Sequence, residues 1–248
     1  SRKEATNHFR EIAKRCLKNN GKVLVPVFAV GRSQEVMIVL EQLMRKKEIK
    51  NVPVYLDGMI WEATAIHTAY PEYLNNKLRS QTFQKGKNPL LSDIFKRVDG
   101  HEMRQRIIRD PDPCIVLATS GMMVGGPVME YFKSWSDEEK NMIVFVGYQA
   151  EGSFGRRVQK GWRDLTLNIA GNTTQLKVNM DVETVDGFSG HSDRRQLMNF
   201  VNNMSPRPER LIFGHGEESK CLDLSSSVHK KFNMNTAAIK NLETIRFV

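Results

Sequence analysis

The chain has 248 residues, which exceeds the usual domain size of roughly 100–200 residues, so one large domain or two smaller ones are expected. Hydrophobic residues make up 40% of it and charged residues 26%, which excludes a disordered chain, and no apolar run approaches the roughly 18 residues of a membrane span. The net charge of +9 and the pI of about 9.5 favour polyanionic partners, with solubility alone as the alternative.

Three widely spaced cysteines, Cys16, Cys114 and Cys221, form no CxxC pair. This argues against a cysteine zinc site and predicts buried thiols in a reducing compartment, here the cytoplasm. The chain starts without an initiator Met or an apolar signal core, which indicates an internal boundary rather than a natural N-terminus.

The first part of the chain predicts alternating helices and buried strands. Residues 5–19 have one apolar stripe at helical spacing, and the continuous apolar run at 22–30 is typical of a strand buried on both faces. Ser33 is the predicted N-cap of a helix over 34–46. Further strands are expected at 52–56, 114–118 and 142–146, helices at 60–69 and 101–109, and an irregular stretch from about 80 to 100. This alternation predicts an α/β domain with a mainly parallel sheet.

The pattern changes from about residue 172. Residues 175–186 alternate apolar and polar side chains, as a half-exposed strand does. The expected elements that follow are a helix near 194–203, a strand at 211–213, a helix near 218–231 and a terminal strand at 244–248.

Ligand-contacting residues of α/β sheets gather beyond the carboxyl ends of the strands. Five sequence features are expected there: Gly31-Arg32, Asp57-Gly58, Ser120-Gly121, Gly147-Tyr148 and Gly214-His215. A loop glycine lets the backbone approach a ligand closely, although any one of these features alone is better explained by a simple turn.

Two histidines have settings that suit chemistry. His191 lies directly before a predicted helix, and Asp193 is placed either to cap that helix or to orient the imidazole. His215 follows a predicted strand between two glycines, which leave its ring unobstructed as a metal ligand or proton donor. The pair favours an active site over two unrelated turn histidines. By contrast, Arg156-Arg157 and the scattered basic residues of the helices are interpreted mostly as solvated charge, with phosphate contact by a minority of them as the alternative, and Met122-Met123 as core.

Several sequence blocks, in order along the chain, resemble those of β-CASP proteins. They are VPVFAVGRSQE at 25–35, SGMMVGGP at 120–127, GYQAEGS at 147–153, GHSD at 190–193 and GHGE at 214–217. YLDGMIWEAT at 55–64 is similar to the archaeal relatives of the cleavage and polyadenylation specificity factor nuclease.

The resemblance implies a fold and an activity. Residues 1–174 would be the α/β β-CASP domain, and residues 175–248 the C-terminal portion of the metallo-β-lactamase αββα sandwich into which that domain is inserted. The family contains zinc-dependent ribonucleases. His215 would be a ligand of one of two zinc ions, and His191 would protonate the leaving oxygen, with Asp193 orienting it. The glycine-rich blocks are predicted to contact RNA through Gly31, Arg32, Ser120, Gly121 and Gly152.

The family's HxHxDH motif does not occur in this chain. One histidine cannot hold two metal ions in a fixed geometry, so the chain alone is predicted neither to bind catalytic zinc nor to cleave RNA. The parent protein would cleave RNA as an endonuclease or a 5′–3′ exonuclease in 3′-end formation and transcription termination.

The resemblance also suggests a homodimer formed through the C-terminal segment at 245–248, with the transcription machinery as a further partner. A non-catalytic RNA-binding or dimerisation module is the alternative function. It is disfavoured because inactive members of the family tend to lose the two C-terminal histidines, which this chain keeps. A small-molecule hydrolase is disfavoured by the insertion and the basic charge.

Overall fold

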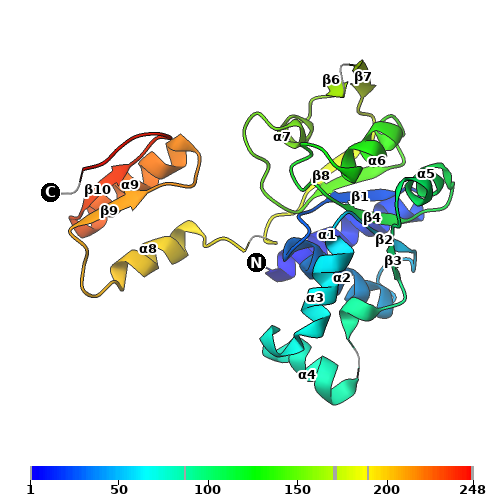
Figure 1. The fold of residues 1–248 in the computed structure, drawn as a ribbon, viewed down its shortest axis with the longest axis horizontal. Coiled ribbons are helices and arrows are strands. Elements are labelled where there is room, and N and C mark those ends of the chain that lie inside the picture. The colour runs from blue at the N-terminus through cyan, green and yellow to red at the C-terminus, as the bar shows by residue number, and fades with distance from the viewer. Residues whose placement is uncertain (1, 87, 170–171, 189, 247–248) are drawn as a thin grey trace. The chain divides into compact units, whose positions relative to one another are not determined.

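The computed structural model describes residues 2–86, 88–169, 172–188 and 190–246, which form two compact units, Ser1–Ser189 and Gly190–Val248 (Figure 1). The expected boundary between the β-CASP domain and the metallo-β-lactamase segment, between residues 174 and 175, stays a prediction. In the described part of the chain, no helix combines the length and the apolar character needed to cross a bilayer.

The first unit is built on a six-stranded sheet in the order β3-β2-β4-β1-β5-β8, with every neighbouring pair parallel. The strands are β1 (Val23–Pro26), β2 (Val54–Asp57), β3 (Phe95–Arg97), β4 (Ile115–Ala118), β5 (Met142–Phe145) and β8 (Asp181–Thr184). The sequence prediction of an α/β fold with a parallel sheet is confirmed.

The apolar runs form strands because both faces of the sheet are buried. Successive strand residues point to opposite faces. In β1, Val23 and Val25 pack into one core cluster, whereas Leu24 packs into the other. β4 and β5 alternate in the same way, so a continuous apolar run rather than an alternating one marks these strands.

Helices cover each face of the sheet (Figure 1). One face carries α1 (Arg2–Lys18), α2 (Arg32–Arg45) and α3 (Ile60–Ala69), and the other carries α5 (His101–Arg109), α6 (Pro127–Trp135) and α7 (Phe154–Gln159). The helices expected at 5–19, 60–69 and 101–109 are confirmed by α1, α3 and α5.

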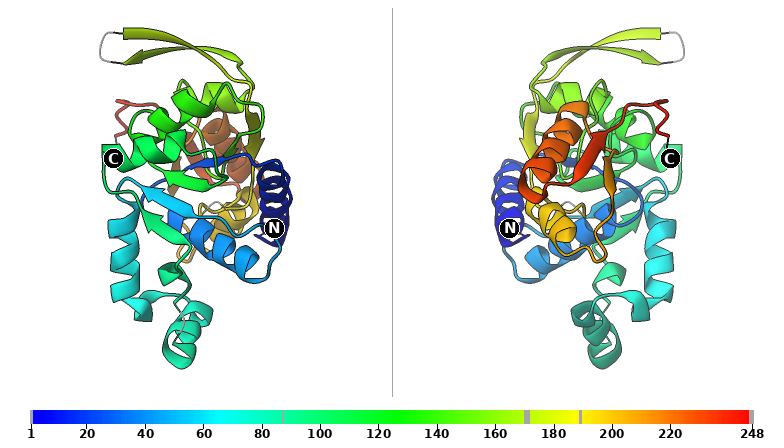
Figure 2. Two further views of the ribbon diagram at one scale, coloured as in Figure 1. Left: turned by 90° about the vertical axis from the view of Figure 1, so that its right-hand side faces the viewer. Right: turned by 90° about the vertical axis from the view of Figure 1, so that its left-hand side faces the viewer.

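Two projections extend from opposite ends of the first unit (Figure 2). One contains α4 (Asn76–Lys85), flanked by the short 3-10 turns η1 (Pro71–Tyr73) and η2 (Pro89–Leu91). The other is an antiparallel hairpin of β6 (Asp164–Ile169) and β7 (Asn172–Lys177). The expected irregular stretch at 80–100 is therefore wrong, since it contains part of α4, η2 and β3.

Two other local predictions are corrected by hydrogen bonding and burial. Gly31, not Ser33, caps α2, because the buried Ser33 hydroxyl donates to the Ala29 carbonyl at 2.7 Å. The strand expected at 175–186 is two strands, β7 and β8, separated by a connection in which Val178 and Met180 are buried.

The second unit contains α8 (Arg194–Asn202), β9 (Arg210–Phe213), α9 (Glu218–Phe232) and β10 (Asn235–Ala238), with β9 and β10 parallel. Its buried cluster consists of Val201, Val228 and Met234, with partly buried neighbours. The terminal strand expected at 244–248 is wrong for residues 244–246, which have no strand structure, and residues 247–248 lie outside the described residues.

The three thiols differ in burial, so their reactivity should differ. Burial raises the pKa of Cys16 to about 12 and that of Cys114 to about 12, whereas Cys221 is only half-buried. A raised pKa leaves about three orders of magnitude less thiolate near neutral pH. Iodoacetamide at pH 8 should label Cys221 in the folded chain and all three cysteines in urea, as mass spectrometry would show. Rapid labelling of Cys16 before unfolding would contradict this burial.

Candidate active site

The loops after three neighbouring strands, β4, β1 and β5, meet at the carboxyl edge of the sheet. The Gln149 side chain amide donates to the Gly121 carbonyl at 2.7 Å, which ties the loop after β5 to the loop after β4. A Cβ added to Gly121 would lie 2.9 Å from the Phe28 nitrogen, so this glycine is needed for the loop after β1 to approach. Parts of the three sequence motifs at 25–35, 120–127 and 147–153 are thus brought together at this edge.

Gly31 and Arg32 lie at the start of α2. Gly31 has a φ of 80°, and its N–H donates to the Gln34 side chain at 2.7 Å. Arg32 forms an ion pair with Glu35 one turn later, and its side chain is only 18% exposed. Its positive charge is therefore largely committed within the helix, which weakens its expected role as a phosphate contact.

Ser120 and Gly152 occupy the neighbouring loops in different ways. The Ser120 hydroxyl donates to the Gly125 carbonyl at 3.0 Å and accepts from the Val124 N–H at 3.1 Å, so it fixes its own turn. Gly152 is exposed, has a φ of 79° and leaves open space where a Cβ would stand. Of the two, Gly152 is the position at which a ligand has free access to the backbone.

Asp57, at the end of β2, belongs to a buried polar network and is not accessible to a ligand. Its carboxylate accepts two hydrogen bonds from the Arg104 guanidinium, at 2.8 and 3.0 Å, and one from the Tyr131 hydroxyl at 2.8 Å. Burial raises the pKa of Tyr131, and the hydrogen bonds to Asp57 raise the pKa of Arg104. The network joins β2, α5 and α6 beside the carboxyl edge.

The second unit brings its two predicted histidines together. The imidazole rings of His191 and His215 have centroids 6.4 Å apart with an interplanar angle of 60°. Both residues are exposed, and His215 has a left-handed φ of 61°. A non-glycine residue in this region is uncommon and directs attention to function. Two imidazoles at this separation can contact one substrate group.

Asp193 is the N-cap of α8. Its carboxylate accepts from the Gln196 N–H at 2.8 Å, while the Gln196 side chain accepts from the Asp193 N–H at 2.8 Å. This reciprocal pair is a capping box, so capping, one of the two roles considered for Asp193, is confirmed.

Zinc requires several nitrogen, sulfur or oxygen donors in a fixed geometry. Within the described ranges, no group of three or more His, Cys, Asp or Glu side chains is arranged to hold a metal ion. The donor set of the described residues therefore does not by itself fit a zinc ion, and no step through zinc follows from these residues alone.

Comparison with protein-family models gives two matches. Residues 33–158 match the Beta-Casp domain, and residues 175–239 match the Zn-dependent metallo-hydrolase RNA specificity domain. The chain belongs to the β-CASP family. The β-CASP match contains the carboxyl-edge loops after β4 and β5, and the second match contains both histidines.

Curated relatives of this β-CASP chain are archaeal proteins named transcription termination factor FttA. Identity is 59% over 247 residues with the protein of Methanosarcina mazei, 56% over 246 residues with that of Pyrococcus horikoshii, and 46% over 246 residues with that of Lokiarchaeum. Each comparison covers 99% of this chain and 38–39% of the relative. The chain thus spans about two fifths of the length of these relatives.

One part of the β-CASP domain that could contact ligands was not predicted from the sequence. Arg157, interpreted as mainly solvated, and Met123, interpreted as core, both line a cavity between the loop 123–127, α6, α7 and β6. Nothing in the local sequence distinguishes them, because the cavity exists only where segments distant in sequence pack together.

Proposed function

We propose that this chain is part of a zinc-dependent ribonuclease that hydrolyses RNA phosphodiester bonds in transcription termination. The observation that carries the proposal is the convergence of His191 and His215, from two separate loops, to ring centroids 6.4 Å apart. The description of the domain matched at 175–239, as an RNA specificity domain of Zn-dependent metallo-hydrolases, supports the substrate class and the metal.

The two histidines have unequal roles in this proposal. His191 donates a proton to the leaving oxygen, as an imidazole does near neutral pH. Asp193, besides capping α8, helps to orient the His191 loop. His215 contributes one ligand to a pair of zinc ions, with the other ligands supplied by residues that this chain lacks. The chain alone is therefore proposed to be inactive.

RNA contacts are proposed at the carboxyl edge of the first unit, at Gly31, Arg32, Ser120, Gly121 and Gly152. Gly31 and Gly152 offer exposed backbone, whereas Arg32 is paired with Glu35 and Gly121 is buried. The proposal thus places more weight on backbone contacts than on the Arg32 charge. A net charge of +9 supports attraction of RNA.

The names of the relatives mention transcription termination only, and the finer assignments rest on the sequence resemblance to β-CASP nucleases. For the longer protein of which this chain would be a part, we propose cleavage as an endonuclease, as a 5′–3′ exonuclease or in both modes, together with a homodimer formed through the C-terminal segment around Ile245. The transcription machinery is the further partner, and the cytoplasm is the proposed location, because termination takes place where transcripts are made.

Because the proposed zinc ligands other than His215 are not in this chain, we expect the chain to bind RNA without cleaving it. Labelled single-stranded RNA should remain intact with the chain and added zinc, at the level of a His215→Ala control, while the longer protein cleaves it. The logarithm of the RNA association constant should fall linearly with the logarithm of the salt concentration, because each neutralised phosphate releases counterions. If the chain cleaves RNA with zinc faster than the His215→Ala control does, the proposed inactivity of the chain is wrong. If the longer protein does not cleave RNA, the proposed function is wrong.

A further inference from the structure

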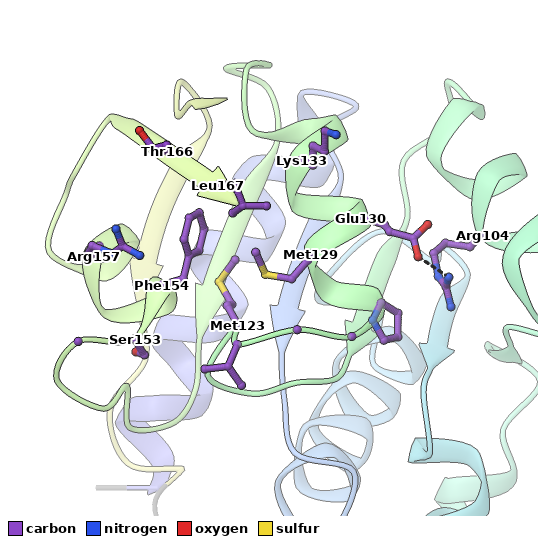
Figure 3. Close-up of a pocket in the computed structure, with 15 residues that line it drawn as sticks. Arg104, Met123, Met129, Glu130, Lys133, Ser153, Phe154, Arg157, Thr166 and Leu167 are labelled. Carbon is purple, nitrogen blue, oxygen red and sulfur yellow. Dashed lines mark hydrogen bonds and ion pairs between the residues drawn. The ribbon is translucent and has the colours of Figure 1, made fainter. Parts of the chain in front are cut away.

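A cavity of about 1140 Å³ opens on the first unit and is lined by residues of that unit alone (Figure 3). It lies between the loop 123–127, α6, the start of α7 and β6. Its volume slightly exceeds the range of about 300–1,000 Å³ that is usual for small-ligand pockets. Gly125 and Gly152 at its border leave open space where a Cβ would stand, so backbone lines the entrance without side chains that close it.

The floor of this pocket is apolar and polarisable. Met123, Met129, Phe154 and Leu167 converge on it, as Figure 3 shows, and each is at most 9% exposed. A flat ring can pack in van der Waals contact with the sulfur of a methionine thioether and with an aromatic ring. A heterocyclic base has this shape and chemistry.

The cations around the pocket are not equivalent. Arg104 is already committed to Asp57 and Glu130, and its hydrogen bonds with these carboxylates offset its charge. Arg157, on the other side, has its guanidinium 5.4 Å from the Phe154 ring centroid, and its Nε is buried without a hydrogen-bond partner among the described residues. Arg157 lines the pocket, and no carboxylate among the described residues pairs with its guanidinium, so its charge is available to an anionic ligand group.

Lys133 adds a second cation at the rim of the pocket, where its side chain is exposed. Glu130 is drawn beside Arg104, on the side of the pocket away from Arg157 (Figure 3). A carboxylate repels an anion, so an anionic ligand group is expected at the Arg157 side.

We propose that this pocket binds a nucleotide unit, with its base against the floor formed by Met123 and Phe154 and its phosphate at Arg157. The ligand is either one residue of a single-stranded RNA or a free nucleotide, which share this chemistry. For RNA, the inference rests on the proposed function and adds a binding subsite on the first unit.

The test uses the full chain and three variants. Arg157→Ala removes the guanidinium, and Arg157→Lys keeps the charge without the planar group. Thr166→Trp adds a bulky ring at a lining position on the exposed face of β6 without changing charge. Arg79→Ala, on α4, is the control for loss of one exposed arginine elsewhere on the unit. Fluorescence anisotropy with labelled oligouridine and with labelled AMP measures binding, and circular dichroism checks folding.

Arg157→Ala and Thr166→Trp should each weaken RNA binding by about tenfold, with a smaller loss for Arg157→Lys and about twofold or less for Arg79→Ala. Oligouridine containing 4-thiouridine should crosslink to peptides containing Met123 or Phe154. Binding of AMP with the same variant pattern, but not of oligouridine, would identify the free nucleotide as the ligand.

The proposed binding at the pocket would be wrong if Arg157→Ala and Arg79→Ala lose the same amount of RNA affinity. It would also be wrong if a folded Thr166→Trp chain binds RNA with undiminished affinity. Crosslinks confined to other loops, such as that of Phe28, would overturn it while leaving the proposed ribonuclease function intact. If Arg157→Ala does not fold, Thr166→Trp and the crosslink map still decide. Failure of the longer protein to cleave RNA would instead count against the proposed function alone.

Discussion

Replacing Asp57 with Ala should lower the free energy of unfolding of this chain by about 3–5 kcal/mol. The Asp57 side chain is 3% exposed and that of Arg104 is 14% exposed, so the substitution leaves a largely buried guanidinium with Glu130 as its remaining carboxylate partner. Tyr131 would also lose the acceptor of its hydroxyl, 2.8 Å away. Urea unfolding followed by tryptophan fluorescence measures the change.

Glu62→Ala is the matched control for Asp57→Ala. Glu62 also pairs with an arginine, Arg97, at 2.9 Å, but the two side chains are 52% and 50% exposed. Solvent screens such a pair, so its loss should cost about 1 kcal/mol or less. If Asp57→Ala costs no more than Glu62→Ala, the buried network does not stabilise the fold as argued. Tyr131→Phe should cost about 1 kcal/mol, because it removes one hydrogen bond.

In the longer protein, His191→Asn should lower turnover by about 10²–10⁴-fold while RNA affinity changes little. The reason is that asparagine can donate a hydrogen bond but cannot transfer a proton to the leaving oxygen. His215→Asn should abolish turnover, because it removes the proposed zinc ligand, and it should also lower the zinc content of the protein. Single-turnover cleavage, RNA binding and metal analysis separate these effects.

His8→Asn is the control for the histidine variants, since His8 lies on α1 with its side chain 48% exposed. It should keep full turnover. Parental turnover in His191→Asn would remove the proton-donor role, and an unchanged zinc content in His215→Asn would remove the ligand role. The two results are independent, so one role can fail without the other.

Much of the sheet could be predicted because its strands are buried on both faces. Ile115, Val116 and Leu117 form an unbroken apolar run, which is typical of a strand inside a parallel sheet. The helix α6 was missed although its pattern was present, since Pro127 suits a first helical turn and apolar residues follow at helical spacing up to Trp135. The strand β10, Asn-Thr-Ala-Ala, has weak strand propensity, and only its pairing with β9 defines it.

Part of the candidate site could likewise be predicted from the sequence, and part could not. The histidine motifs are local in sequence, and the structure brings His191 and His215 together. The Arg32–Glu35 ion pair was predictable from the three-residue spacing, which places both side chains on one helix face. The partnership of Asp57 with Arg104 was not, because 47 residues separate them and no short pattern encodes the contact. The same limit applies to Arg157 and Met123 around the pocket.

The small core of the second unit has a consequence for spectroscopy. Only Val201, Val228 and Met234 are fully buried hydrophobic residues among those described there, while Phe200 is 65% and Leu222 53% exposed. Such a unit should unfold at lower urea than the first. All three tryptophans and all five tyrosines of the chain lie before residue 190. Tryptophan emission therefore reports the first unit alone, and circular dichroism or phenylalanine-resolved NMR is needed to see the histidine-bearing unit melt.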